Sequence, residues 1–538
     1  MELTLLFIAV IILACIAAHH VSGRFGIPML LVFIGVGMLF GSDGLFKIAF
    51  DNYSLAETGC SVALIFIMFY GGFGTNWSKA RPVAVKSLLL SSFGVVFTAL
   101  LTGLFCHLAL GMELVSGMLI GACLGSTDAA TVFSILRAKR LNLKYNTASL
   151  LELESGSNDP FAYMLTMIML SLMHGSVTGG DIVWRLFEQL VFGAGFGAVI
   201  AFLAWKVLKK FTFVTAGLES VFMVAVALLA FAAPAAVGGN GYLSAYIVGI
   251  YLGNHSINGK RNLVHFFDGV TGLLQMLVFF MLGLLAFPSK LPEVVIPGIL
   301  IALFMTLVAR PVSVFGILAP FRCKLNQMLL VSWSGLRGVA SIVFAIMAAA
   351  AADFEQYDLF HTVFLVVMFS LLLQGSLIPF VARKLKMIDN TNNVLTTFND
   401  YSEELPVQFI RLNVNEGDRW DGKQIKELDL PPETLIALII REGRRIVPKG
   451  FTMLSAGDTA VLCAPACGDG VGINLTEIFV TKESTYCGLM LSEVPPENGN
   501  LVVLIKRGNH VIIPRGRTVF KDGDVLVINS VEEGARTV

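Results

Sequence analysis

Two acidic residues lie within stretches of the sequence that are otherwise apolar. Asp159 directly follows Asn158, and Asp128 directly follows Thr127 in the apolar stretch before it. A charged side chain at the centre of a lipid bilayer costs about 2.5–3.5 kcal/mol on insertion scales, so acids at that depth usually serve a function. We therefore expect the two carboxylates and their polar neighbours to mark a path for a cation or a proton.

The spacing of the polar residues before Asp159 predicts that several of them point into one cavity. Ser155 lies four residues before Asp159, and Glu154 lies four residues before Asn158, so each pair shares one face of a helix. Pro160 lacks a backbone donor, and its ring crowds the carbonyl four residues earlier. That carbonyl is then free to bind a cation or a water molecule.

A break in the helix at Thr127 and Asp128 would place helix-end dipoles and backbone carbonyls near the centre of the membrane. Asp128 would then either join the ion path or cap the broken helix, and Thr127 and Ser155 would either face the ion or bond their own backbone. Such oxygen atoms suit a hard monovalent cation, whereas the sequence has no His and Cys cluster for a transition metal. We expect neither a resident metal nor a cofactor.

Two arginines, Arg310 and Arg337, lie in later apolar stretches, and buried charges need partners. We expect Glu154 to pair with Arg337, because this pairing neutralises both charges and leaves Asp159 free for the ion. Arg310 is expected to compensate backbone carbonyl ends or Asp128 near a helix crossing. In this interpretation Glu154 and the two arginines support the site and do not bind the ion.

The composition is that of an integral membrane protein. Of the 538 residues, 56% are hydrophobic and only 14% are charged, and the mean hydropathy is +0.77, whereas a soluble domain has about 25% charged residues. The net charge is +0, which gives no reason to expect nucleic acid as a partner. A helix needs about 20 apolar residues to cross a bilayer, and on that basis we predict thirteen spans. Their centres lie near Ile11, Gly35, Ile65, Val96, Cys123, Asp159, Gly195, Val226, Tyr246, Leu274, Leu303, Val339 and Val366.

The basic residues predict the orientation of these spans. One set of alternate loops carries most of the Lys and Arg residues, whereas the opposite set carries only Lys47, Arg185 and Lys290. Loops rich in Lys and Arg stay on the cytoplasmic side. We therefore expect the amino terminus to lie outside and the carboxyl-terminal part to lie in the cytoplasm of a bacterium, with the protein in its inner membrane.

The chain after residue 387 is more polar, and from about residue 405 it is expected to be soluble. We predict a membrane domain over residues 1–387, a linker over 388–404, a first lobe over 405–467 and a second lobe over 468–538. The lobes are related by a repeat, because residues of one recur 66 positions later in the other. The matching pairs are Pro448 and Pro514, Gly450 and Gly516, Thr452 and Thr518, and Asp458 and Asp524.

Residues 1–385 resemble the NhaP-type monovalent cation/proton antiporters. The resemblance rests on four motifs in order: Thr127-Asp128, Glu154-Ser155-x-x-Asn158-Asp159-Pro160, Ala309-Arg310-Pro311 and Gly335-Leu336-Arg337-Gly338. It implies thirteen helices with inverted repeats and broken crossing helices. It also implies a homodimer in which a mobile core domain presents Asp159 to either side of the membrane, binding a proton or a cation but never both. Electrogenic relatives have two adjacent aspartates, so Asn158 implies electroneutral one-for-one exchange.

Residues from about 405 to 530 resemble the carboxyl-terminal lobe of the RCK (TrkA-C) regulatory domain, a ligand-responsive module of potassium channels and transporters. The matching residues are Val414, Gly417, Gly422-Lys423, Ile439, Arg441, Pro448, Gly450 and Gly457-Asp458. The two resemblances together are closest to the potassium/proton antiporters of the cell-volume-regulation subgroup. They imply a cytoplasmic α+β regulatory tail that binds a nucleotide or cyclic dinucleotide, or that serves only as a structural clamp.

The leading hypothesis is an antiporter, not an enzyme, that exchanges K⁺ or Na⁺ for H⁺ under control of its tail. A channel gated by the same tail is the alternative. A potassium channel should carry a filter such as Thr-Val-Gly-Tyr-Gly, and the sequence has none. A membrane enzyme lacks support because no nucleophile and base pair or metal motif is present.

Overall fold

The computed structural model of the chain divides into two compact units, residues 1–403 and 404–538. The residues that it describes are 2, 6, 9–17, 29–139, 141–175, 179–211, 217–257, 259–351, 358–389, 407–442, 444–465, 475–482, 484, 486–493, 501–507, 510–512 and 514–529.

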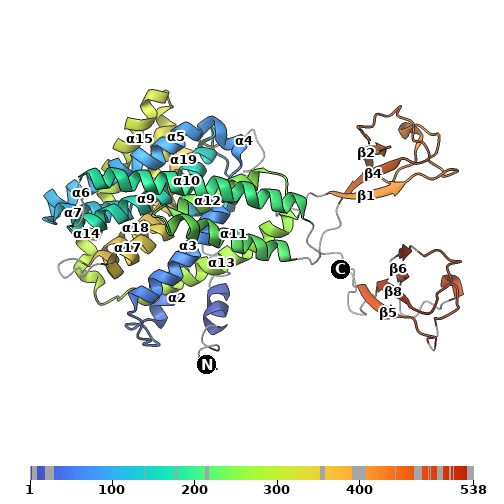
Figure 1. Ribbon diagram of the computed structural model, residues 1–538, viewed down its shortest axis with the longest axis horizontal. Helices are drawn as coiled ribbons and strands as arrows, with labels where there is room; N and C mark the ends of the chain where they lie inside the picture. Colours follow the sequence, from blue (N-terminus) through green and yellow to red (C-terminus); the bar gives the residue numbers. More distant parts are fainter. Residues whose placement is uncertain are drawn as a thin grey trace. The chain divides into compact units, whose positions relative to one another are not determined.

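The described part of the first unit is mainly helical (Figure 1). Its helices are α2 (Met29–Phe40), α3 (Tyr53–Gly74), α4 (Trp77–Ala80), α5 (Ala84–Leu89), α6 (Val95–Leu110), α7 (Leu114–Cys123), α8 (Ala129–Ala138), α9 (Thr147–Met173), α10 (Gly179–Lys210), α11 (Leu218–Ala235), α12 (Gly241–Asn254), α13 (Lys260–Leu285), α14 (Leu291–Phe304), α15 (Arg310–Leu318), α16 (Leu325–Trp333), α17 (Val339–Ala351), α18 (Leu359–Phe369) and α19 (Ser376–Lys384).

Seven helices of the described part are long and apolar enough to cross a membrane, judged by length and composition. They are Tyr53–Gly74, Trp77–Leu110, Gly180–Lys210, Leu218–Ala235, Asn262–Leu285, Leu291–Phe321 and Leu359–Lys384. Each of the predicted span centres also lies on a helix. The 27-residue helix α9 is absent from the seven, and it carries three acids, Glu152, Glu154 and Asp159.

The predicted helix break at Thr127 and Asp128 is confirmed. Helix α7 ends at Cys123 and α8 begins at Ala129, and a second break separates α16 from α17 between Trp333 and Val339. The two breaks cross, because the backbone N–H of Asp128 donates to the carbonyl of Leu336 over 2.7 Å. Backbone groups within a bilayer must find partners inside the protein, and each break supplies partners for the other.

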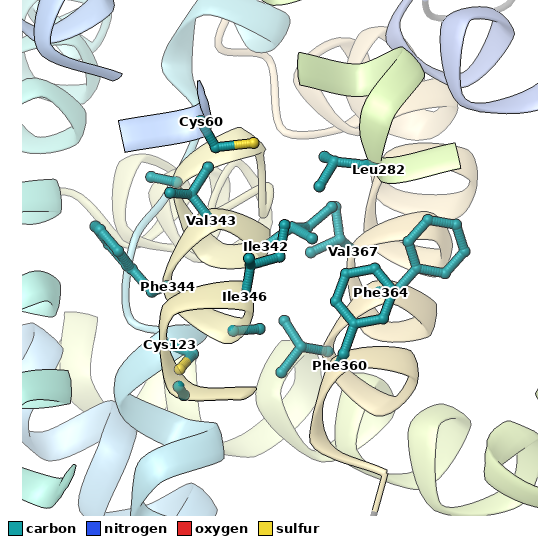
Figure 2. Close-up of a cluster of buried hydrophobic side chains, with 14 of the residues drawn as sticks. Cys60, Cys123, Leu282, Ile342, Val343, Phe344, Ile346, Phe360, Phe364 and Val367 are labelled. Atoms are coloured by element: carbon teal, nitrogen blue, oxygen red, sulfur yellow. The ribbon is translucent and has the colours of Figure 1, made fainter. Parts of the chain in front are cut away.

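The helices of the first unit form two packed groups. Helices α2, α3 and α10–α13 pack on one another, while α5–α9 pack with α14–α19. Small residues allow the closest approach: a Cβ atom on Gly37 of α2 would lie 2.2 Å from the Phe280 carbonyl oxygen of α13. Helix α17 joins the groups, since its Ile342 and Ile346 lie in one apolar cluster with residues of α3, α13 and α18 (Figure 2).

The second unit contains two four-stranded antiparallel sheets with equivalent strand orders, β1-β4-β2-β3 and β5-β8-β6-β7, which confirms the predicted repeat (Figure 1). The strands are β1 (Val407–Asn413), β2 (Leu435–Arg441), β3 (Arg444–Ile446), β4 (Thr459–Pro465), β5 (Leu475–Phe479), β6 (Leu501–Arg507), β7 (His510–Ile512) and β8 (Asp524–Asn529). Helical structure in the described part of this unit is confined to single 3-10 turns at Ile425–Glu427 and Leu491–Glu493. Of the predicted α+β fold, the described residues therefore show the β-sheets and no α-helix.

Each lobe contains the same ion pair. Arg441 donates two hydrogen bonds of 2.7 Å to the buried carboxylate of Asp458, and Arg507 does the same to Asp524. These bonds hold the pKa of each carboxyl below its usual value. Because the folded-state pKa is lowered, the stabilisation is present above the unfolded-state pKa of about 3.9 and is lost as the pH falls through the folded value.

We expect Asp458→Asn to lower the free energy of unfolding of the first lobe at pH 7 by about 1.5–3 kcal/mol, the range for hydrogen bonds to charged groups. The difference from wild type should shrink as the pH falls below about 4, where the wild-type carboxylate also becomes protonated. Urea unfolding of the fragment 404–538, followed by the fluorescence of its single tryptophan, Trp420, measures this change. Asp524→Asn is the matched control in the second lobe, and an equal shift from it would show that the lobes unfold together.

Candidate functional site

The candidate ion site lies where α9 passes the break between α7 and α8. Ser126 in the break donates a short hydrogen bond to Oδ1 of Asp159. The side-chain amide of Asn158 donates to Oγ1 of Thr127 over 2.6 Å. Ser155 donates to the Thr127 carbonyl over 2.6 Å and accepts from the Ala129 N–H over 2.9 Å. The structure thus brings Thr127, Ser155, Asn158 and Asp159 together.

Asn158 and Asp159 present oxygen atoms in a buried position. The two residues are 1% and 7% exposed, and within the described part of the chain Oδ1 of Asn158 has no hydrogen-bond partner. An unsatisfied buried acceptor costs free energy, and a cation or a water molecule would relieve that cost. A carboxylate beside an amide oxygen and a hydroxyl is a ligand set for a hard monovalent cation.

Asp128 is engaged with its own helix. Its Oδ1 accepts from the Thr131 N–H over 3.1 Å, and its Oδ2 accepts from the Thr131 hydroxyl over 2.5 Å. The carboxylate therefore caps the first turn of α8, which favours the second of the two roles considered for it. Gly338 in the other break leaves room for it, since a Cβ atom there would lie 2.5 Å from Cβ of Asp128.

The expected pairing of Glu154 with Arg337 is wrong. Glu154 pairs with Arg310 over 2.5 Å, and the two side chains are 1% and 5% exposed. Arg337 instead donates to the carbonyls of Gly125 (3.3 Å) and Ser126 (3.0 Å), where α7 ends. The two arginines have exchanged the roles predicted for them.

The positions of the two arginines explain why their partners differ from those predicted. Arg337 lies in the break between α16 and α17, so the crossing puts it beside the negative end of the α7 dipole. Arg310 begins α15 directly after the π-helical turn Met305–Ala309, and it reaches past Gly335 to α9. A Cβ atom at Gly335 would lie 2.8 Å from Nε of Arg310, so a larger residue there would obstruct the arginine.

Several residues that support the site were not predicted from the sequence. Ser126 directly precedes Thr127 and Asp128, and this position beside the expected helix break is the sequence signal that could have identified it. Ser370 accepts from the Arg337 N–H over 3.0 Å and donates to Gln374 over 2.5 Å. Both residues lie in the π-helical turn Ser370–Gly375, far from the acids in sequence. With Arg310 and Arg337 they line a small pocket beside the crossing.

Comparison with known proteins identifies two matching families. The family model described as "Sodium/hydrogen exchanger, transmembrane" matches residues 8–384, and the model described as "TrkA-C domain" matches residues 409–466 and 475–535.

Among curated relatives, "K(+)/H(+) antiporter NhaP2" of Shewanella sp. (strain MR-4) is 35% identical over 456 residues, covering 82% of this chain and 77% of the relative. "K(+)/H(+) antiporter NhaP" of Alkalimonas amylolytica is 32% identical, covering 86% of this chain and 82% of the relative. Among solved structures, the sodium proton antiporter MjNhaP1 from Methanocaldococcus jannaschii at pH 8 aligns with a TM-score of 0.63 at 24% identity. That alignment covers 72% of this chain and 99% of the other.

The reassigned ion pair predicts which charge exchange restores stability. Removing one partner of a buried pair costs about 3–5 kcal/mol, so Glu154→Arg and Arg310→Glu should each lower the melting temperature strongly. Combining these two should recover part of the loss, because the pair is rebuilt in reverse. Combining Glu154→Arg with Arg337→Glu should not. Size-exclusion chromatography of the heated full-length protein in detergent measures the melting temperature. Better recovery with Arg337→Glu than with Arg310→Glu would contradict the assignment.

Proposed function

Because the chain belongs to the sodium/hydrogen exchanger family, we propose that this cation/proton antiporter exchanges K⁺ for H⁺ and that Asp159 binds both ions in turn. The observation that carries the role of Asp159 is its burial on α9 against Ser126, next to the unpartnered oxygen of Asn158. K⁺ is preferred over Na⁺ because the relatives from Shewanella and Alkalimonas are K⁺/H⁺ antiporters.

The charges around the site explain why the two ions would compete. Arg310 forms an ion pair with Glu154, and Arg337 donates hydrogen bonds to the carbonyls just after α7. Among the hydrogen bonds of the described residues, none joins either arginine to Asp159. A buried carboxylate without a counter-charge is unstable, so Asp159 needs a bound proton or a bound monovalent cation. Either ion neutralises the Asp159 carboxylate. Movement of the site through the membrane interior would cost little free energy only when the carboxylate is neutralised.

This charge balance also supports exchange of one cation for one proton. The residue before Asp159 is an amide, so the pair carries one titratable carboxylate. Thr127, Ser126 and the Asn158 oxygen add ligand atoms but no charge. Each half-cycle would then move one positive charge, in opposite directions, and the exchange would be electroneutral.

We extend the proposal to the arrangement in the membrane. Thirteen spans, with the amino terminus outside and the tail in the cytoplasm, agree with the distribution of Lys and Arg. Two broken helices that cross are the arrangement expected of inverted repeats around a central site. The group α5–α9 with α14–α19, which carries the site, would move against the group containing α3 within a homodimer in the bacterial inner membrane.

The tail is proposed to regulate exchange by binding a ligand. Its match to the TrkA-C family supports ligand binding, and two equivalent lobes could hold a nucleotide or cyclic dinucleotide between them. Gating of a channel by the tail was the alternative function. It gains no support from the family match, which is to exchangers.

Transport by the purified protein tests the role of Asp159. In proteoliposomes with an imposed pH gradient, K⁺ should dissipate the gradient in the wild type, and Asp159→Asn should reduce the rate to that of empty vesicles, because the amide cannot bind a proton. Asp181→Asn, the same change at the outer end of α10, is the control and should transport normally. Na⁺ is added in parallel. Exchange by Asp159→Asn at the wild-type rate would refute the assignment.

The proposed one-for-one exchange predicts no net current. On solid-supported membranes, a step in K⁺ concentration should drive proton movement in the wild type without a sustained transported charge, and the rate should not depend on membrane potential. The reason is that the site carries a single titratable carboxylate. Currents that reverse with the imposed potential would show that the exchange moves unequal charge.

A further inference from the structure

A short segment after α19 is bonded to the loop that leads into the helix of the ion site. We call residues 385–389 the connector and residues 142–146 the entry loop, since the latter joins α8 to α9. The N–H of Lys144 donates to the Met387 carbonyl, and the N–H of Asp389 donates to the Asn142 carbonyl, both over 2.9 Å. Leu143 and Ile388 form an antiparallel bridge between these bonds. The two segments therefore pair like adjacent strands of a sheet.

Helix α16 bonds to both segments. Asn326 donates to the Leu385 carbonyl of the connector over 2.9 Å, and Gln327 donates to the Tyr145 carbonyl of the entry loop over 3.2 Å. Leu143 and Met387 are buried in a single apolar cluster. The connector is thus held by the entry loop and by α16, and α16 leads directly into the second helix break.

The entry loop holds backbone conformations that depend on these contacts. Tyr145 and Asn146, immediately before α9 begins at Thr147, have φ values of 59° and 53°, and Lys386 in the connector has φ of 54°. Left-handed conformations of residues other than glycine cost about 1–3 kcal/mol each and persist only where surrounding contacts impose them. Loosening the connector would therefore release the start of α9.

We propose that the connector and the entry loop form a clasp through which the tail controls the ion site. The inference rests on the proposed function, because it supplies the route for regulation by the tail. The chain runs from the clasp into the tail on one side and, through α9, to Asp159 on the other. Asp159 lies twelve residues beyond Thr147, about 18 Å along a rigid helix. A pull or a release at residue 389 would shift this helix relative to the break that carries Ser126.

A double-mutant cycle in the full-length protein tests the clasp. Asp389→Pro removes the N–H that bonds Asn142, whereas Asp389→Ala keeps it and is the matched control. Asp458→Asn weakens the first lobe of the tail. We expect Asp458→Asn alone to change the rate of K⁺-driven proton exchange by about 5-fold or more, the lower end of typical allosteric coupling. In an Asp389→Ala background, Asp458→Asn should change the exchange rate by the same factor as in the wild type. In an Asp389→Pro background, that factor should fall below about 2-fold, because the effects of two coupled sites are not additive. Additive effects would overturn the clasp.

Amide hydrogen exchange gives a second readout that does not depend on transport. In the full-length protein, Asp458→Asn should raise exchange at the Lys144 amide, which the clasp protects, and leave amides within α3 unchanged. If Asp458→Asn alters transport but not exchange at Lys144, the tail acts by another route and the clasp is refuted alone. If it alters neither, regulation by the tail is refuted with it. Loss of transport in Asp159→Asn tests the antiport itself and is unaffected by both results.

A further variant covers the case in which Asp389→Pro does not fold. Asn326→Ala removes the bond from α16 to the Leu385 carbonyl and leaves the backbone intact. We expect it to reduce the transport response to Asp458→Asn and to raise exchange at the Lys144 amide. A response equal to that of the wild type, together with unchanged exchange, would contradict the clasp.

Discussion

The rest of the membrane unit depends on one constraint: backbone and charged groups within a bilayer must be satisfied by the protein itself. Two interrupted helices would leave unpaired amides and carbonyls at their broken ends. Their crossing resolves this, because the Asp128 amide bonds the Leu336 carbonyl and Arg337 covers the carbonyls that end α7. The crossing therefore places the side chains of the first break against α9, where they form the candidate ion site.

The same constraint distinguishes the residues that support the candidate site from the residue that is proposed to bind the ion. Glu154 and Arg310 neutralise each other, and Asp128 is occupied in capping α8. Asp159 is hydrogen-bonded to Ser126 and, among the described residues, to neither arginine, which supports the proposal that a proton or a cation neutralises its charge. The family match and the potassium-exchanging relatives agree with a site of this kind.

The tail and the membrane unit are built on different physical principles. Each lobe is a small sheet stabilised by an apolar core and one arginine–aspartate pair. The segment that leads toward the first lobe does not leave the membrane unit freely, because it first pairs with the loop between α8 and α9. A regulatory signal that reached this pairing would act close to the start of the helix that bears Asp159.

The sequence by itself indicated which polar residues gather at the candidate ion site, where the first helix breaks, and that the tail is a repeat. These features are local: an acid in an apolar run, a polar pair in a span, and motifs that recur at a constant offset. Only the tertiary structure decided that Glu154 pairs with Arg310 and not with Arg337, that Ser126 bonds Asp159, and that the connector pairs with the entry loop. These contacts join residues far apart in sequence. They depend on the rotation of each helix about its axis and on the angles at which helices cross. Hydrophobic patterning does not specify these angles precisely enough to predict which side chains come into contact.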